Sequence, residues 1–305
     1  MLWLIITLVS YFILAVVYLV DKHLLTSTLP SPRVYTFYVG ILAMVILVII
    51  PFINFYVPSL KQLLLSLGAG LIFSYCLLWF YKALSLFEAS RIVPASGALG
   101  PILTFLLIFI FSGGKEKMGL IDFIALLLLI IGTFLITLEK GKKINWASLK
   151  YAAIIAFLFS IYLVVSKQVY LVQPFLNGLI WIKVGGLFFS LILFILYPEV
   201  RKSISFKIRD EKISRKTFFI FVGNQILGGS SSLLQNWAIA LAPIIYVPMI
   251  TALQGVQYAF LLFLIVLLSL KFPKMLREEI TRSALFQKAI ATIIIIIGIA
   301  ILAFK

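Results

Sequence analysis

The chain has 305 residues, of which 63% are apolar and only 12% are charged, whereas a soluble domain carries roughly 25% charged residues. This composition excludes an ordinary soluble domain and indicates lipid as the solvent. The net charge of +16 does not indicate nucleic-acid binding, because the basic residues lie in short loops between apolar runs, where cytoplasmic retention and anionic lipid favour them.

Apolar runs of about 20 residues recur along the whole chain, which is the pattern of membrane-spanning α-helices. The runs are continuous and do not alternate over about ten residues, which favours helices over barrel strands. The first run has no basic region before it and no small-residue cleavage site after it, so we expect it to be retained. In chain order, the expected spans are 3–20, 33–53, 62–86, 89–111, 119–138, 149–170, 175–197, 217–241, 244–270 and 285–304.

Two of the expected connections are very tight, at Leu86–Glu88 and at Leu241–Pro243. The sequence YKALSL leads into the first turn, and the similar sequence NWAIAL leads into the second. Each turn is followed by a Val- or Ile-containing run, then by a proline (Pro94 or Pro248), and then by an Ala-Leu pair. The shared order of turn, proline and small residues indicates an internal repeat.

We interpret the chain as two five-helix halves, residues 1–140 and 141–305. Because each half has an odd number of spans, the two halves are expected to have inverted topologies, which is a common architecture of secondary transporters. The predicted fold class is therefore an all-α integral membrane protein of ten transmembrane helices in two inverted five-helix repeats.

The segment Ala83–Pro101 resembles the drug/metabolite transporter superfamily, specifically its EamA-type ten-helix transporters. Ala238–Gln257 looks like the second copy of this segment. Gly132–Ile136 and Gly298–Leu302 look like the glycine-containing helices that close each half in this family. The resemblance implies a fold with a central cavity and a function in secondary export of small metabolites, amino acids or drugs across the plasma membrane.

The orientation in the membrane stays open. Most of the 26 Lys and Arg residues lie in the odd-numbered connections, which places these connections in the cytoplasm and both termini outside. The family is usually drawn with cytoplasmic termini. Both arguments place the two termini on one side. A further departure from the family pattern is that the second copy has Gln254-Gly255 where the first has Gly100-Pro101.

Lys183 is the most informative candidate residue, because it lies nine residues into the seventh span. A lysine at such a depth costs about 2.5–3.5 kcal/mol on insertion scales. It is expected to bind an anionic group of a solute, such as a carboxylate or phosphate, or to take part in proton coupling. The alternative is a lysine that reaches the membrane interface along its aliphatic stem.

Polar and aromatic side chains of the neighbouring spans complete the candidate site. The amides are expected to face an aqueous cavity and to bind a zwitterionic or anionic small molecule, and the alternative is that they join helices to one another. The deeper tryptophans are expected to line the same cavity. The substrate-binding candidates, besides Lys183, are Gln225, Gln235, Gln254, Gln257, Trp79, Trp181, Trp237 and Tyr258.

Three prolines within the expected spans, Pro94, Pro101 and Pro248, can kink a helix and free its carbonyl groups. They predict either a broken helix or gating hinge at the binding site, or kinks that serve packing alone.

The sequence does not predict an enzyme, a cofactor or a metal site. One histidine, His23, and one cysteine, Cys76, cannot form an ordinary zinc site, and the sequence shows no arrangement typical of a Ser-His-Asp triad. A phosphate-binding Gly-Lys-Ser/Thr loop is also absent from the sequence, so ATP is not expected to drive transport directly. The leading interpretation is a secondary transporter. The alternative is a lipid-handling membrane protein, either a scramblase or a lipid-modifying enzyme.

Overall fold

A computed structural model describes residues 2–25, 31–87, 89–137, 146–204, 215–260, 264 and 282–304. All regular structure within these residues is helical. The helices are α1 (Leu2–Leu25), α2 (Pro32–Leu42), η1 (Ala43–Phe52), α3 (Leu60–Leu86), α4 (Ala89–Phe111), α5 (Leu120–Thr137), α6 (Trp146–Val172), α7 (Phe175–Leu196), α8 (Pro198–Ile204), α9 (Arg215–Leu241), η2 (Ile244–Tyr246), α10 (Val247–Ala252) and α12 (Arg282–Ala303).

The expected ranges coincide with these helices to within about five residues, with three exceptions. The range 33–53 is divided into α2 and the 3₁₀-helix η1. The short helix α8 was not predicted, because its seven residues were assigned to a basic loop. The range 244–270 is divided into η2, α10 and helical residues 254–260, and most of its remainder lies outside the described residues. The predicted boundary between the halves, at residues 140 and 141, also lies outside them.

Five of the described helical segments are long and apolar enough to cross a membrane: Pro32–Phe52, Leu60–Leu86, Trp146–Val172, Phe175–Leu196 and Phe286–Ala303. Their surfaces carry large exposed apolar side chains, such as Val45 and Val48, each 68% exposed. Such side chains are favourable against lipid and unfavourable against water. The chain is therefore a membrane protein.

Local sequence signals explain where several helices begin and end. The Ser31 hydroxyl accepts a hydrogen bond from the Val34 N–H at 3.4 Å, and Pro32 follows at the first turn of α2, where its missing N–H costs nothing. The turn between α4 and α5 contains Gly113 and Gly114, whose φ angles of 62° and 76° lie in the left-handed region that favours glycine.

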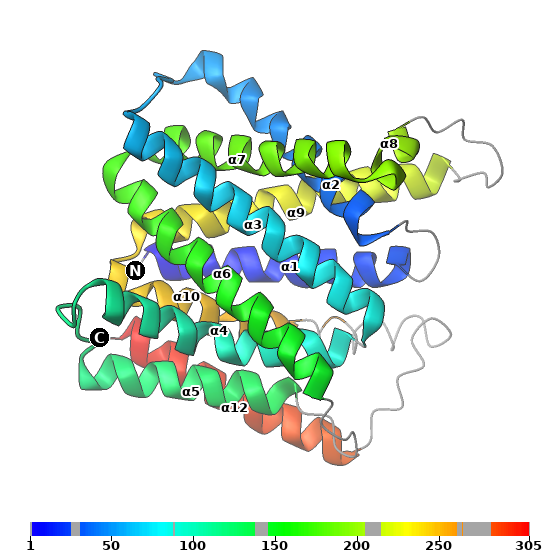
Figure 1. Ribbon diagram of the computed structural model, residues 1–305. Helices are drawn as coiled ribbons and strands as arrows, with labels where there is room; N and C mark the ends of the chain where they lie inside the picture. The colour runs from blue at the N-terminus through cyan, green and yellow to red at the C-terminus, as the bar shows by residue number, and fades with distance from the viewer. Residues whose placement is uncertain are drawn as a thin grey trace.

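The helices form one bundle in which successive segments run back and forth along a common direction (Figure 1). The N- and C-terminal ends lie at the same end of the bundle. We call this the terminal end. Helix α1 packs along α9, α3 packs along both α6 and α7, α4 packs along α6, and α5 packs along α12.

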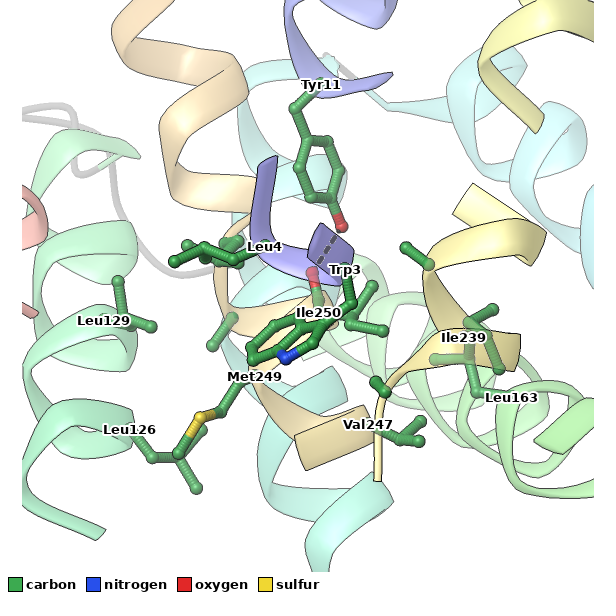
Figure 2. Packing of buried hydrophobic residues seen from close by; sticks show 14 of the residues in the cluster. Trp3, Leu4, Tyr11, Leu126, Leu129, Leu163, Ile239, Val247, Met249 and Ile250 are labelled. Atoms are coloured by element: carbon green, nitrogen blue, oxygen red, sulfur yellow. Dashed lines mark hydrogen bonds between the residues drawn. The ribbon is translucent and has the colours of Figure 1, made fainter. Parts of the chain in front are cut away.

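The largest apolar core lies where α1, α5, α6, α9 and α10 meet. Trp3 from α1, Leu129 from α5, Leu163 from α6, Ile239 from α9 and Met249 from α10 all belong to it (Figure 2). Each of these side chains is no more than 7% exposed. Because its residues come from both halves of the sequence, this core holds the first part of the chain against the last.

Helices α3 and α7 approach each other more closely than any side chain would permit. A Cβ atom added to Gly70 would contact the Ile182 carbonyl oxygen and would lie 2.7 Å from the Gly186 nitrogen. A Cβ atom added to Gly185 would contact the Leu67 carbonyl oxygen and lie 2.8 Å from the Leu67 Cα. Small residues at the contact are a common means of close packing between membrane helices, because they let the two backbones meet.

Candidate functional site

Lys183 lies inside the bundle and contacts a different helix. Its Nζ donates a hydrogen bond to the Ser232 Oγ of α9 at 3.0 Å, and it lies 5.5 Å from the ring centroid of Phe73 on α3. At 1.5 Å per residue, Lys183 is about 12 Å from the start of α7, and Ser232 is about 13 Å from the end of α9. The amino group therefore faces a partner within the bundle, which argues against a side chain directed to the membrane interface.

A network of hydrogen bonds surrounds Asn236, one helical turn along α9 from Ser232. The Asn236 Oδ1 accepts hydrogen bonds from the hydroxyl groups of Tyr162 and Tyr170 on α6, each at 2.8 Å. Its Nδ2 donates to the carbonyl oxygen of Ser232 at 2.8 Å. The Tyr162 ring in turn lies 4.7 Å from the ring of Phe73. Helices α3, α6, α7 and α9 thus contribute to one polar and aromatic cluster, which we call the Lys183 cluster: Phe73, Tyr162, Tyr170, Lys183, Ser232 and Asn236.

Lys167 is a second buried lysine that sequence reasoning did not single out. Its side chain is 3% exposed, and its Nζ donates to the carbonyl oxygen of Ala240 at 2.9 Å. Ala240 lies in the last turn of α9, where carbonyl groups lack helical partners and the helix dipole favours a cation. Lys167 therefore stabilises the end of α9 against α6.

The helical path after Pro248 is interrupted at Leu253. The Val256 N–H donates to the Leu253 carbonyl at 2.9 Å and so does not pair with the carbonyl of Ala252. Side chains from the first half of the chain donate hydrogen bonds to the carbonyl groups near this interruption. The Tyr11 hydroxyl donates to the Ile250 carbonyl at 2.8 Å, as the dashed line in Figure 2 shows, and the Thr133 Oγ1 donates to the Ala252 carbonyl at 3.1 Å.

The three candidate prolines differ in their positions. Helix α4 continues without interruption through Pro94 and Pro101. Pro248 lies in the first turn of α10, where a proline is readily accommodated. The only candidate near a break in a described helix is therefore Pro248, and the break itself comes five residues later.

The predicted amides are distributed over two regions. Gln225 of α9 donates to the Tyr35 hydroxyl of α2 at 3.0 Å. Gln254 lies beside α4, with its Oε1 3.3 Å from the Cβ position of Gly97, and its Nε2 lies 3.5 Å from the Tyr258 hydroxyl. Gln257 is buried, and Gln235 is half-buried on α9. Of these amides, Gln235 lies closest along the chain to the Lys183 cluster.

The three predicted tryptophans lie in three different environments. The Trp181 Nε1 donates to the Tyr56 carbonyl at 3.2 Å, and its ring stacks on Phe55, so this side chain secures the segment that leads into α3. Trp79 packs against Tyr151 with 5.3 Å between ring centroids. Trp237 is 40% exposed. None of the three has a ring or hydrogen-bond contact with the Lys183 cluster within the described residues.

The interruption at Leu253 allows a stability test. The variant Thr133→Val keeps the side-chain shape but removes the hydroxyl donor to the Ala252 carbonyl. We expect the free energy of unfolding to fall by about 1 kcal/mol, as for other hydrogen bonds between membrane helices. Denaturant titration of the purified chain in lipid–detergent micelles would measure this change.

Thr292→Val provides the matched control, because the Thr292 Oγ1 donates at 2.8 Å to the Lys288 carbonyl within its own helix. This variant is expected to change stability by less than half as much. Equal effects of the two substitutions would contradict a specific role for Thr133 at the interruption.

Comparison with known proteins identifies a fold and no function. Neither a family model nor a curated protein sequence matches the chain. One solved structure, described as "Crystal structure of protein", is similar with a TM-score of 0.63 and 17% sequence identity, and the match covers 99% of this chain and 96% of that one. At this identity the likeness concerns the fold alone, and it extends over the whole bundle.

Proposed function

We propose that the protein is a secondary transporter of small solutes, built from ten membrane-spanning helices in two inverted halves. Several of the helix contacts support the repeat. In the two halves, α1 corresponds to α6, α2 to α7, α3 to α9 and α5 to α12. Exchanging the halves therefore converts the pair α1–α9 into the pair α6–α3, and both pairs pack side by side. The same exchange leaves the pairs α5–α12 and α2–α7 unchanged, and both of these pairs are also in contact. The resemblance of the sequence to EamA-type transporters of the plasma membrane leads to the same proposal.

The observation that carries the proposed function is the Lys183 cluster. A lysine well inside a membrane helix is costly unless it has a polar environment, and such residues typically mark solute or ion pathways. Here the amino group donates a hydrogen bond to Ser232 and lies over the Phe73 ring of α3, which in turn contacts the Tyr162 ring of α6. A protein that served only as a membrane scaffold would have no use for this costly arrangement.

Alternating access would open the two ends of the bundle in turn. The apolar core in Figure 2 includes Trp3 at the start of α1 and Val247 at the start of α10. The interruption at Leu253 provides a point at which the ninth span can bend while Tyr11 and Thr133 hold its carbonyl groups. Opening of the terminal end would require these contacts between the halves to separate. Transport of this kind draws on an ion or solute gradient.

Reconstitution into proteoliposomes tests the proposal. Vesicles loaded with a mixture of amino acids, organic acids and amines would be diluted into solute-free buffer, and retained solutes would be measured by mass spectrometry. We expect at least one solute to leave faster than from protein-free vesicles, and we expect Lys183→Met to slow its release at least tenfold. Lys82→Met is the matched control, because Lys82 lies at the exposed end of α3, 5.4 Å from the Trp79 ring.

The same vesicles distinguish transport from lipid handling. Fluorescently labelled phospholipid in the inner leaflet would report its exchange between leaflets. Rapid lipid exchange with no release of any solute would overturn the proposal in favour of a scramblase. Retention of all solutes together with unchanged lipid asymmetry would also overturn it.

A further inference from the structure

The Lys183 amino group has unused hydrogen-bonding capacity. An ammonium group carries three N–H donors. Within the described residues, its one hydrogen bond goes to the Ser232 Oγ, and the face of Phe73 satisfies part of its charge without accepting a directed hydrogen bond. Two donors therefore remain for a further partner.

The described carboxylates are engaged elsewhere or lie far along the chain from this position. The Asp122 Oδ2 accepts a hydrogen bond from the Tyr246 hydroxyl at 3.2 Å, and the Glu199 Oε1 pairs with Arg33 at 2.9 Å. Glu116 lies in the turn between α4 and α5. No described carboxylate forms an ion pair with Lys183. Among the described side chains, no carboxylate compensates this positive charge, in an environment where isolated charges are costly.

The side-chain carbonyl oxygen of Asn236 is already occupied. The Asn236 Oδ1 has two lone pairs and receives two tyrosine hydroxyls. The hydroxyl protons of Tyr162 and Tyr170 are used in these bonds, and one proton of the Asn236 Nδ2 is donated to the Ser232 carbonyl. The remaining hydrogen-bonding capacity of the Lys183 amino group itself consists only of donors, so a partner for this group must supply acceptors.

We propose that the Lys183 cluster is an anion-binding site for a monocarboxylate with an apolar or aromatic body. One ammonium group matches one negative charge, and its two remaining donors match the oxygens of a carboxylate. The rings of Phe73, Tyr162 and Phe159, with centroid separations of 4.7 and 5.7 Å along this series, form an apolar surface next to the charge. This assignment rests on the proposed transport function and narrows its substrate class.

The hydrogen-bonding groups and charges of the Lys183 cluster disfavour amino acids and amines as ligands. Their ammonium group would be best matched by a carboxylate, and the Lys183 cluster contains none. An amine would also face the charge of Lys183. A phosphate dianion would bring a second negative charge, for which the cluster has no second cation.

Binding to the purified full-length chain tests the site without requiring transport. Four probes share one phenyl body and differ in charge: phenylacetate, 2-phenylethanol, phenethylamine and phenylalanine. Inorganic phosphate serves as a fifth probe. Equilibrium dialysis with radiolabelled probes would give the affinities, and the ligand-induced shift in melting temperature would provide a second measurement.

We expect phenylacetate to bind at least tenfold more tightly than any of the other four probes. This preference should disappear in Lys183→Met, persist in Lys183→Arg, and be unchanged in the matched control Lys82→Met. A loss of tenfold or more is the usual effect of removing a charge-assisted hydrogen bond. The comparison of probes on the unsubstituted protein remains decisive if Lys183→Met does not fold.

Equal or tighter binding of phenethylamine, phenylalanine or phosphate would overturn the assignment. Binding of phenylacetate that is unaffected by Lys183→Met would also overturn it. Phenylacetate binding that depends on Lys183, in a protein that releases no solute from vesicles, would contradict transport and leave the anion site standing. Solute release that is independent of charge and of Lys183 would contradict the anion site and leave transport standing.

Discussion

Gly70→Val is expected to prevent the chain from forming a stable, monodisperse bundle, whereas Gly68→Val on the same helix is expected to be tolerated. The Cβ of a valine at position 70 would meet the Ile182 carbonyl oxygen and lie 2.9 Å from the Gly185 Cα. Both are backbone atoms of α7, so no side-chain rotation can make room. The equivalent position at Gly68 has nothing within 4 Å.

The two helices would have to move apart, and that movement would expose apolar surface on both sides of the crossing. Overpacking in a well-packed core costs about 1–3 kcal/mol even when side chains can adjust, and here they cannot. We expect a loss of at least about 3 kcal/mol, which is a large part of the stability of a typical domain. Size-exclusion profiles and melting temperatures of the detergent-purified variants would measure it.

Comparing the two variants separates the effect of valine on the contact between α3 and α7 from its intrinsic effect on helix formation. Both introduce the same β-branched residue into α3, so any intrinsic effect on helix formation is shared. If Gly68→Val and Gly70→Val had equal melting temperatures, the close contact of α3 with α7 would be wrong. A further loss of stability in Gly185→Ala, whose Cβ would meet the Leu67 carbonyl, would locate the contact on both helices.

The helices could be predicted from the sequence because their signal is strong and local. In the segments Trp146–Val172 and Phe175–Leu196, an uninterrupted apolar run leaves few alternatives once lipid is the solvent. α8 was missed because seven residues are too few for a periodic pattern. For Pro248 the sequence left open a hinge or a packing kink. The interruption lies five residues later, at Leu253, and the hydroxyl groups that bind the neighbouring carbonyls come from Tyr11 and Thr133, which no local pattern identifies.

The candidate site could be predicted only in part. Lys183 was identifiable because a charge deep in an apolar run is rare, and the structure gives it a partner on another helix. Lys167 was not singled out, although its side chain is only 3% exposed. Lys167 lies near the end of its run, where a lysine ordinarily reaches the interface. The role of Asn236 depends on two tyrosines that are 74 and 66 residues away in sequence, and no single-sequence pattern predicts such pairings.

Asn236→Leu is expected to lower the free energy of unfolding by about 2–3 kcal/mol. The substitution leaves the hydroxyls of Tyr162 and Tyr170 without the acceptor that both use at 2.8 Å. A buried hydroxyl that loses its partner costs about 1–3 kcal/mol, because water cannot replace that partner. The effect should therefore exceed that of either tyrosine-to-phenylalanine substitution alone, each of which removes one hydroxyl and leaves Asn236 with the other.

The triple variant Tyr162→Phe/Tyr170→Phe/Asn236→Leu should recover most of this loss. Replacing all partners of a buried network by apolar groups of similar shape can be nearly neutral, so we expect stability within about 1 kcal/mol of the original chain. The strong non-additivity of the three substitutions is the measurable sign that they form one network. Denaturant titration of the single, double and triple variants would give the coupling energy.

The triple variant also separates the structural part of the cluster from the part assigned to the solute. Because Asn236 uses both lone pairs of its Oδ1 and donates to Ser232, its role is to hold α6 against α9. Lys183, Ser232 and Phe73 are unchanged in this variant, and the phenyl rings at positions 162 and 170 remain. We therefore expect it to bind phenylacetate with an affinity within about threefold of the original. A triple variant that is as stable as the original but no longer binds the anion would instead place the tyrosine hydroxyls in direct contact with the solute.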